Sequence, residues 1–464
     1  MLFNSVAYLF FLPATVVLYL AMPVRWRHWL LLAASYLFYM WWRPPYILVI
    51  VAMTLVDFAS GILMERARSR RERTAWMVLS LVIDLGMLFW FKYAMFAVDV
   101  ANGLFAAADA PWRFNIGYIL LPIGISFHTF QSLSYVLDVY HGRVKAERDL
   151  GFFALYIAYF PQMMAGPIER KSDLLPQLRA QGEADAEDIR YGVNKILLGF
   201  LKKTVVADTL GPYVDKFHET PEAWNGAAHY LALFLFGMQI FCDFSGYSDI
   251  AIGSARLMGV RLTENFNRPF LSKSVNEYWQ RWHITLGTWV RDYLFLPLMY
   301  AHPGRFVANV LITFAALGFW HGANWNFLLF GLVHGTATIL QYHYDRVPGL
   351  PRMQGPAGRF VRWFFTLQVL LISGVFFRAA STTDAFTILG KLADLRHYDP
   401  RAILAVMTKP QLTEVVMALA LLAVTTAFNR QLRFRYNGLY VLGMLLAIVT
   451  LGQSGANHFI YFQF

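Results

Sequence analysis

The chain has 464 residues, of which 57% are hydrophobic and only 15% charged, and its mean hydropathy is +0.43. Soluble globular proteins carry about 25% charged residues, so this composition excludes an ordinary soluble enzyme and predicts a membrane protein. The net charge of +11 would suggest nucleic acid binding in a soluble protein. In a membrane protein, basic loops on the cytoplasmic side account for it, and no nucleic acid partner is predicted.

Apolar runs long enough to cross a bilayer recur along the chain. A span needs about 20 apolar residues, which predicts roughly eleven transmembrane helices in an all-α polytopic protein. They are expected at 4–22, 46–64, 75–98, 116–140, 150–168, 228–252, 306–323, 325–342, 358–379, 412–428 and 439–452, with a shorter run at 29–42 and a half-polar one at 195–214. The hydrophilic stretches between them are too short for a further domain, so residues 1–464 are predicted to form one membrane domain.

The loop Glu65–Arg73 carries five arginines in nine residues. The positive-inside rule places this loop in the cytoplasm, and counting back along the chain then places the N-terminus outside. The first apolar stretch has no basic region before it and no small-residue cleavage site after it, so we expect it to remain as a span.

Polar residues interrupt the span that is expected at 116–140. His128, Gln131, Tyr135 and Asp138 follow at helical spacing and therefore share one face. A hydrogen-bonded seam between helices is the favoured explanation, and the wall of a hydrated tunnel is the alternative.

The segment Gln239–Ile250 places Asp243 and Asp249 beside Gly246. Unpaired carboxylates are costly in lipid, so a structural ion-pair role is favoured over catalysis. The expected partners are the basic residues that follow closely in the chain, namely Arg256, Arg261 and Arg268.

Residues 276–298 are predicted to form a helix that lies in the interface or dips partly into the protein. At about 100° per residue, one face is apolar and aromatic, and His283 falls at its border. The apolar face comprises Trp279, Trp282, Leu286, Trp289, Val290 and Tyr293.

The segment Gly318–Trp325 places His321 after a strongly apolar run and beside two glycines, with Asn324 one turn further on. Glycine allows close approach of backbone or substrate, although a lone histidine in a span is more often a packed polar residue than a catalyst. His334 and His343 lack a metal-ligand spacing relative to His321, so no metal is predicted. Phosphate-binding loops, dinucleotide fingerprints and a nucleophile elbow are absent from the sequence.

These polar segments resemble the membrane-bound O-acyltransferase family, in the bacterial branch typified by the alginate O-acetylation membrane protein. The similar stretches run in order across nearly the whole chain. They are LPIGISFHTFQSLSYVLDVYHG (121–142), YFPQMMAGPIER (159–170), DFSGYSDIAIG (243–253), ENFNRPF (264–270), EYWQRWHITLGTWVRDYLFLPL (277–298), GFWHGANWNFLLFGLVHG (318–335) and the closing FIYFQF (459–464).

The resemblance implies a ring of helices, with interfacial or re-entrant helices, around a central tunnel that joins both membrane faces. It also implies that His321 is the catalytic residue and that His283 is the second polar residue of the pair. Six further residues are predicted to bind substrate along the tunnel, namely Asn324, Trp320, His128, Gln131, Asp243 and Tyr247.

The predicted reaction is acetyl transfer from cytoplasmic acetyl-CoA, a substrate rather than a bound cofactor, for O-acetylation of an exported or cell-envelope polysaccharide. Neutral imidazole suits the removal of a proton from an attacking hydroxyl, and such help is worth roughly 10²–10⁴-fold in rate. The predicted setting is the bacterial inner membrane, among lipid, with a periplasmic SGNH-type acetyltransferase as partner. The alternatives are transfer from an acyl carrier protein, such as D-alanyl transfer, and transport of an acyl group or small molecule. Alginate, cellulose and peptidoglycan all stay open as acceptors.

Overall fold

The computed structural model describes residues 1–464 except 165, 349–352, 429–436 and 454–464. The described residues form helices and loops without a β-strand, which confirms the all-α class. The closing hexapeptide at 459–464 lies outside the described residues. The chain divides into two compact units, and it passes from one to the other within α10 (Ala186–Phe200), within α12 (Gly226–Arg256) and between Thr263 and Glu264. A single membrane domain therefore stays a prediction.

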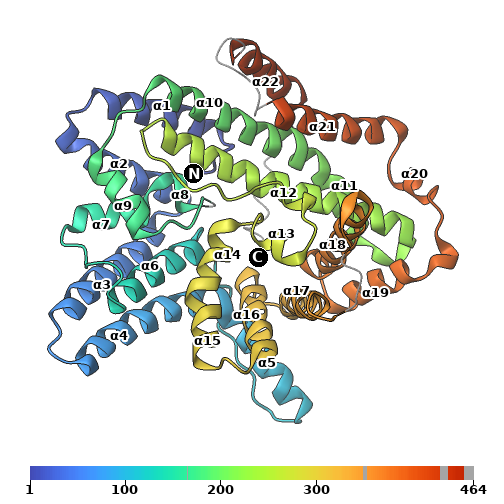
Figure 1. Cartoon of the computed structure of the whole chain (residues 1–464), viewed down its shortest axis with the longest axis horizontal. Coiled ribbons are helices and arrows are strands. Elements are labelled where there is room, and N and C mark those ends of the chain that lie inside the picture. Colours follow the sequence, from blue (N-terminus) through green and yellow to red (C-terminus); the bar gives the residue numbers. More distant parts are fainter. Residues whose placement is uncertain (165, 349–352, 429–436, 454–464) are drawn as a thin grey trace. The chain divides into compact units, whose positions relative to one another are not determined.

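Unit 1 comprises Met1–Val193 and Ala251–Thr263. Within it α3, α4 and α6 pack together (Figure 1). Gly61 of α3 permits this packing, because a Cβ at that position would lie 2.3 Å from the hydroxyl of Tyr135 in α6. The elements that lie wholly in this unit are α1 (Val6–Ala21), α2 (Val24–Met40), η1 (Pro44–Tyr46), α3 (Ile47–Arg66), α4 (Arg70–Leu88), η2 (Phe89–Tyr93), α5 (Ala94–Ala107), α6 (Ile125–Tyr140), α7 (Leu150–Ala158), α8 (Phe160–Met163) and α9 (Lys171–Ala180).

Unit 2 comprises Asn194–Ile250 and Glu264–Phe464. Its helices α16 and α17 lie side by side (Figure 1). Glycine makes this possible, because a Cβ on Gly331 would lie 2.1 Å from the carbonyl oxygen of Phe314. The elements are η3 (Leu201–Ala207), α11 (Asp208–Glu219), η4 (Pro221–Ala223), η5 (Pro269–Leu271), α13 (Val275–Trp279), α14 (Ile284–Val290), η6 (Arg291–Phe295), α15 (Leu296–Ala301), α16 (Phe306–His321), α17 (Trp325–Tyr344), α18 (Gly355–Arg378), α19 (Thr382–Ala393), η7 (Leu395–His397), α20 (Ala402–Val406), α21 (Lys409–Phe428) and α22 (Asn437–Leu451).

Four helical segments of the described chain are long and apolar enough to cross a membrane, which supports a multi-pass membrane protein. They are Pro44–Arg66, Arg70–Ala107, Gly226–Arg256 and Gly355–Arg378, and shorter apolar helices lie at Val6–Ala21, Phe306–His321 and Gly438–Leu451. The predicted total of roughly eleven spans is not confirmed.

Two expected spans have different structures. The helix expected at 116–140 begins only at Ile125, after Gly124 in the left-handed region (φ 73°). The span expected at 150–168 is instead two short helices, α7 and α8, whose residues are almost all buried within the protein. Pro161 at the start of α8 explains the break, because proline suits a first helical turn and cannot continue a helix from before it.

Two unusual segments were predicted with mixed success. The half-polar run at 195–214 continues α10 through the π-helical turn η3 into α11. The prediction of a single helix at 276–298 is wrong. Helix α13 ends at Trp279, and α14 begins only after His283, which has a left-handed backbone (φ 44°, ψ 56°). A helical projection cannot register such a turn.

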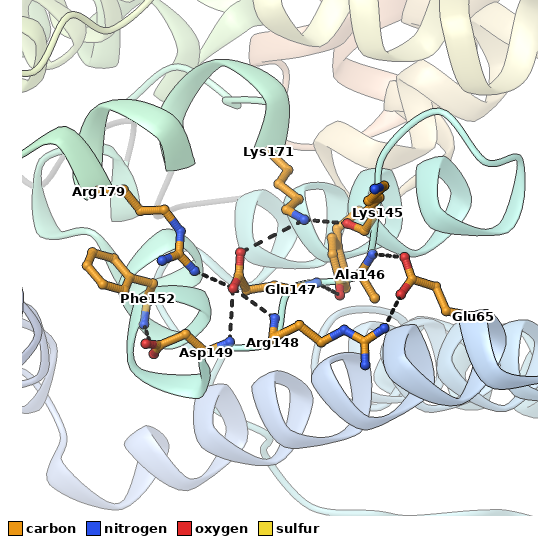
Figure 2. Close-up of polar contacts among 10 residues, drawn as sticks. Glu65, Lys145, Ala146, Glu147, Arg148, Asp149, Phe152, Lys171 and Arg179 are labelled. Atoms are coloured by element: carbon orange, nitrogen blue, oxygen red, sulfur yellow. Dashed lines mark hydrogen bonds and ion pairs between the residues drawn. The ribbon is translucent and has the colours of Figure 1, made fainter.

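An ion-pair cluster in unit 1 joins the loop before α7 to α3 and α9 (Figure 2). Glu147, with 8% of its side chain exposed, pairs with Arg179 and lies 4.0 Å from the Lys171 ammonium. Its Oε1 also accepts the backbone N–H groups of Arg148 (2.8 Å) and Asp149 (2.9 Å). These bonds fix the polar loop, whose backbone would otherwise lack partners.

Candidate active site

His321 lines a small cavity within unit 2, which we call the chamber, of about 50 Å³. Its walls come from α12, η5, α13 and the turn after it, α17 and α18. They are mostly apolar and aromatic, and Trp282, Phe330, His334 and Phe377 are among them. A volume of this size corresponds to a few water molecules, so the chamber suits a short acyl group.

His321 is the last residue of α16, and Gly322 follows it in an extended conformation. The ring lies 5.2 Å from Phe377 and 5.5 Å from Phe330, both close to edge-on, and the residue is 3% exposed. A Cβ on Gly322 would lie 2.2 Å from the ring of Phe327, so glycine is needed for this close turn. His321 therefore lies at the C-terminal end of a helix, a position that favours positive charge.

His283 is fully buried and caps the N-terminus of α14. Its Nδ1 accepts the backbone N–H of Leu286 at 3.4 Å, so the neutral ring carries its proton on Nε2. A left-handed backbone is uncommon for a residue other than glycine, and such strain gathers at functional sites.

Trp320 joins the two predicted catalytic histidines. Its ring centroid lies 5.0 Å from that of His321 and 5.9 Å from that of His283. The structure therefore brings together three of the predicted site residues around one indole.

A second, open pocket of about 600 Å³ in unit 2, which we call the cationic pocket, adjoins the chamber along the chain. Four of its lining side chains are cations and none is acidic; the lining comprises Asn267, Arg268, Leu271, Lys273, Arg281, Arg359, Phe360 and Trp363. Consecutive residues divide between the two cavities: Phe270 lines the chamber and Leu271 the cationic pocket, and Arg281 lines the cationic pocket and Trp282 the chamber.

Backbone hydrogen bonds hold these two segments together. The N–H of Asn267 donates to the carbonyl of Arg281 at 2.8 Å, and the N–H of Ile284 donates to that of Asn265 at 3.0 Å. Arg268 has a left-handed backbone (φ 49°) immediately before Pro269, a position that normally avoids the α regions. Arg268 thus has a strained backbone, and its side chain lines the cationic pocket.

None of the six predicted tunnel residues lines the chamber. Asn324 is exposed and caps α17, because its Oδ1 accepts the N–H of Asn326 at 2.9 Å. Asp243 pairs with Lys203 (2.8 Å), whose ammonium also lies 5.9 Å from the ring centroid of Tyr247. Their roles in substrate binding stay predictions.

The prediction that arginines pair with Asp243 and Asp249 is wrong. Asp249 pairs with Lys195 (2.8 Å) and Lys202 (2.5 Å), just as Asp243 pairs with Lys203. Arg256 and Arg261 pair instead with Asp188 in unit 1, and Arg268 lines the cationic pocket. The lysines that made 195–214 seem too polar for a span are the counterions of these buried carboxylates.

His128 and Gln131 lie on α6 in unit 1. Gln131 donates to the carbonyl of Tyr156 in α7 at 2.6 Å, and the Tyr135 hydroxyl accepts the N–H of Glu147 at 3.1 Å. These bonds fit the predicted seam between helices. His128 is 4% exposed, and its two ring nitrogens make no hydrogen bond within the described residues.

Some polar residues of interest were missed from the sequence. Asp57 and Asp84 are fully buried on α3 and α4, and the hydroxyl of Ser80 donates to Asp57 at 2.5 Å. Their position inside apolar helices was the available signal. His334 was considered only as a metal ligand, yet it lines the chamber. Among the described residues, no group of three or more His, Cys, Asp or Glu side chains is placed to hold a metal ion.

Comparison with known proteins identifies a matching protein family and several relatives. Residues 147–382 match the membrane-bound O-acyltransferase (MBOAT) family. The chain is 38% identical to the probable alginate O-acetylase AlgI of Azotobacter vinelandii over 91% of this chain and 83% of that protein. It is 27% identical to the peptidoglycan O-acetyltransferase of Helicobacter pylori over 85% and 80%. It is 30% identical to the teichoic acid D-alanyltransferase of Bacillus subtilis over 48% and 60%.

Proposed function

The chain belongs to the membrane-bound O-acyltransferase family, and on that premise we propose that it transfers an acetyl group from cytoplasmic acetyl-CoA, with His321 as general base. Membership makes the chain an acyltransferase, which decides against the transporter hypothesis. The observation that carries the proposal is the apolar chamber at His321 next to the cationic pocket.

The cationic pocket suits the phosphates of coenzyme A. Arginine forks bind phosphate oxygens in pairs, and lysine adds a point charge. Phe360 and Trp363 offer aromatic faces for a base, because every nucleobase has a face that can stack. The pocket lies at the start of α18, close in sequence to Arg346 and Arg362, so the positive-inside rule favours its opening to the cytoplasm.

The spacing along α18 matches the pantetheine arm. Trp363 lines the cationic pocket and Gly374 lines the chamber, so eleven residues, or about 16 Å of helix, separate them. The arm between the pyrophosphate and the sulfur has about the backbone length of four amino acids, which extends to roughly 14 Å. Phosphates in the cationic pocket would therefore leave the thioester beside His321.

The chemistry then follows from the position of His321. Its neutral ring removes the proton of the attacking hydroxyl as the new C–O bond forms, and the C–S bond of the thioester breaks. The protonated ring is stabilised by the C-terminal end of α16 and returns the proton to the leaving thiolate. His283, across the indole of Trp320, orients the acyl carbonyl or His321.

The acceptor is an exported or cell-envelope polysaccharide, reached across the inner membrane through a periplasmic SGNH-type acetyltransferase. The support is the similarity to an alginate O-acetylase and a peptidoglycan O-acetyltransferase, each over most of the chain. A base between a cytoplasmic donor site and an external acceptor site lets the acetyl group cross while the polar coenzyme stays inside.

The second candidate is transfer from a carrier protein, which the similarity to a teichoic acid D-alanyltransferase over about half of the chain favours. A carrier presents its phosphopantetheine with one phosphate, whereas coenzyme A brings three. The lining carries four cations; Glu277 pairs with Arg281 at 2.7 Å, and the remaining excess of positive charge favours the more highly charged donor.

The test uses inside-out membrane vesicles from the native host, supplied with radiolabelled acetyl-CoA. His321→Ala should lower label in the polysaccharide by roughly 10²–10⁴-fold while the protein stays in the membrane. The matched control is His343→Ala, because His343 is exposed on α17. Undiminished transfer by His321→Ala would remove this residue as the base.

Charge reversal separates the two donors. Arg359→Glu should raise the KM for acetyl-CoA without lowering kcat, because it weakens ground and transition states alike. Label that appears only when an acylated carrier protein replaces acetyl-CoA would support the second candidate.

A further inference from the structure

His334 lies in the middle of α17, is 1% exposed and lines the same chamber as His321. Aromatic rings fix its orientation: Tyr278 is nearly parallel to it at 6.0 Å and Phe330 meets it edge-on at 4.8 Å. Phe330 also meets His321, so one phenyl ring contacts both histidines. No step described above uses His334.

A neighbouring tryptophan determines which nitrogen of His334 carries a proton. The indole N–H of Trp279 donates to Nδ1 at 3.3 Å. Indole can only donate, so Nδ1 must accept and the proton of the neutral ring is on Nε2. A proton on both nitrogens would point two N–H groups at each other, so the contact also disfavours the charged ring.

The Nε2–H group is the donor that remains. Within the described residues, the bond from Trp279 is the one hydrogen bond of the His334 ring. Ser373, another polar residue of the chamber wall, already donates its hydroxyl to the carbonyl of Leu370 at 2.8 Å. A buried donor in an apolar cavity is costly unless a ligand accepts its hydrogen bond.

We propose that His334 is a neutral hydrogen-bond donor whose Nε2–H binds the carbonyl oxygen of the thioester in the chamber. The inference rests on the proposed function. As the hydroxyl oxygen bonds to the carbonyl carbon, the C=O π electrons move to oxygen, and His334 stabilises that negative charge. When the C=O bond re-forms, the C–S bond breaks, and the thiolate takes the proton that His321 removed from the hydroxyl.

Two substitutions separate this role from packing. His334→Gln keeps an N–H donor and loses the aromatic ring, whereas His334→Phe keeps the ring and loses the donor. Loss of one such donor typically lowers kcat by about 10²–10³-fold. We expect that loss in His334→Phe, with little change in the KM for acetyl-CoA, and substantial recovery in His334→Gln.

A structural role gives the opposite order, because the stack with Tyr278 and Phe330 would tolerate phenylalanine and not glutamine. His343→Phe on the same helix is the control for a general effect of the substitution. Native kcat in His334→Phe would overturn the proposal.

A second measurement needs no acyl donor. The ¹⁵N shifts of His334 in the detergent-solubilised protein, assigned by comparison with His334→Gln, report the tautomer. We expect a neutral ring protonated on Nε2 from pH 5 to 7, and a ring that protonates more readily in Trp279→Phe. An Nδ1–H tautomer would overturn the inference whatever the donor is. If the tautomer is as expected but His321→Ala keeps its activity, the proposed function fails instead.

Discussion

Substitution of His283 tests whether its side chain orients the acyl carbonyl or His321, or only caps α14. The residue suits this test because it has both a strained backbone and a place beside Trp320. Its left-handed conformation costs an ordinary residue roughly 1–2 kcal/mol, whereas asparagine and glycine adopt it readily. Loss of the side-chain cap of α14 costs about 1 kcal/mol for alanine and only a few tenths for glycine. Native histidine already bears the left-handed cost, so from these two effects His283→Ala should lose only the cap, about 1 kcal/mol of stability, whereas asparagine also relieves the strain and should lose less.

Activity should follow a different order. His283→Asn keeps an amide that can donate a hydrogen bond to the acyl carbonyl or to His321, whereas His283→Gly keeps only the backbone conformation. We expect the transfer rate per folded molecule to be higher in His283→Asn than in His283→Gly, and His283→Ala to resemble glycine.

Two measurements are needed on the same preparations. Thermal unfolding in detergent gives the stability of each variant and the fraction of folded protein. Acetyl transfer from radiolabelled acetyl-CoA is then divided by that fraction. Equal normalised rates for the asparagine and glycine variants would refute the hydrogen-bonding role and leave His283 as a helix cap.

Three further predictions concern packing, pH and orientation. Gly331→Ala should destabilise unit 2 by about 1–3 kcal/mol, because its Cβ would lie 2.1 Å from a carbonyl oxygen, while Gly335→Ala, at 3.2 Å from a side-chain carbon, should be milder in thermal unfolding. Burial raises the pKa of the Glu169 carboxyl to about 7, although hydrogen bonds from a threonine oppose this shift. The protonated carboxyl therefore contributes to folding stability fully below pH 4.5, and this contribution is lost as the pH rises through 7. Glu169→Gln should remove up to about 3 kcal/mol of that pH dependence in melting curves. A cysteine at Ser69, with the single native cysteine Cys242 replaced by alanine, should react with impermeant thiol reagents only after the inner membrane is opened, and labelling of intact spheroplasts would reverse the topology.

The sequence predicted the long apolar helices well, because bilayer-spanning length is itself the signal. It failed where an apolar run is buried by protein rather than lipid. The run at 150–168 has the composition of a span, yet α7 has only nine residues and α8 four. Composition does not distinguish the two environments, and only the proline at 161 indicated a break.

The candidate site could be predicted only in part, because sequence patterns relate residues that are close in the chain. His321 was found because its neighbours match a family, and a lone histidine would not have sufficed. The tautomer of His334 depends on the Trp279 indole, 55 residues away in the chain. Contacts between distant segments are invisible to spacing rules, which relate residues within one helix.

The left-handed turn at His283 explains how three consecutive residues reach the cationic pocket, the chamber and the indole of Trp320. In a continuous helix, residues 281, 282 and 283 would follow at about 100° steps around one axis. Here Arg281 lines the cationic pocket, Trp282 the chamber, and His283 faces the indole of Trp320. Hydrogen bonds to Asn265 and Asn267 hold this turn on both sides. These bonds offset a backbone strain of roughly 1–3 kcal/mol, and the turn places a cationic side chain, an apolar wall and a histidine on consecutive residues.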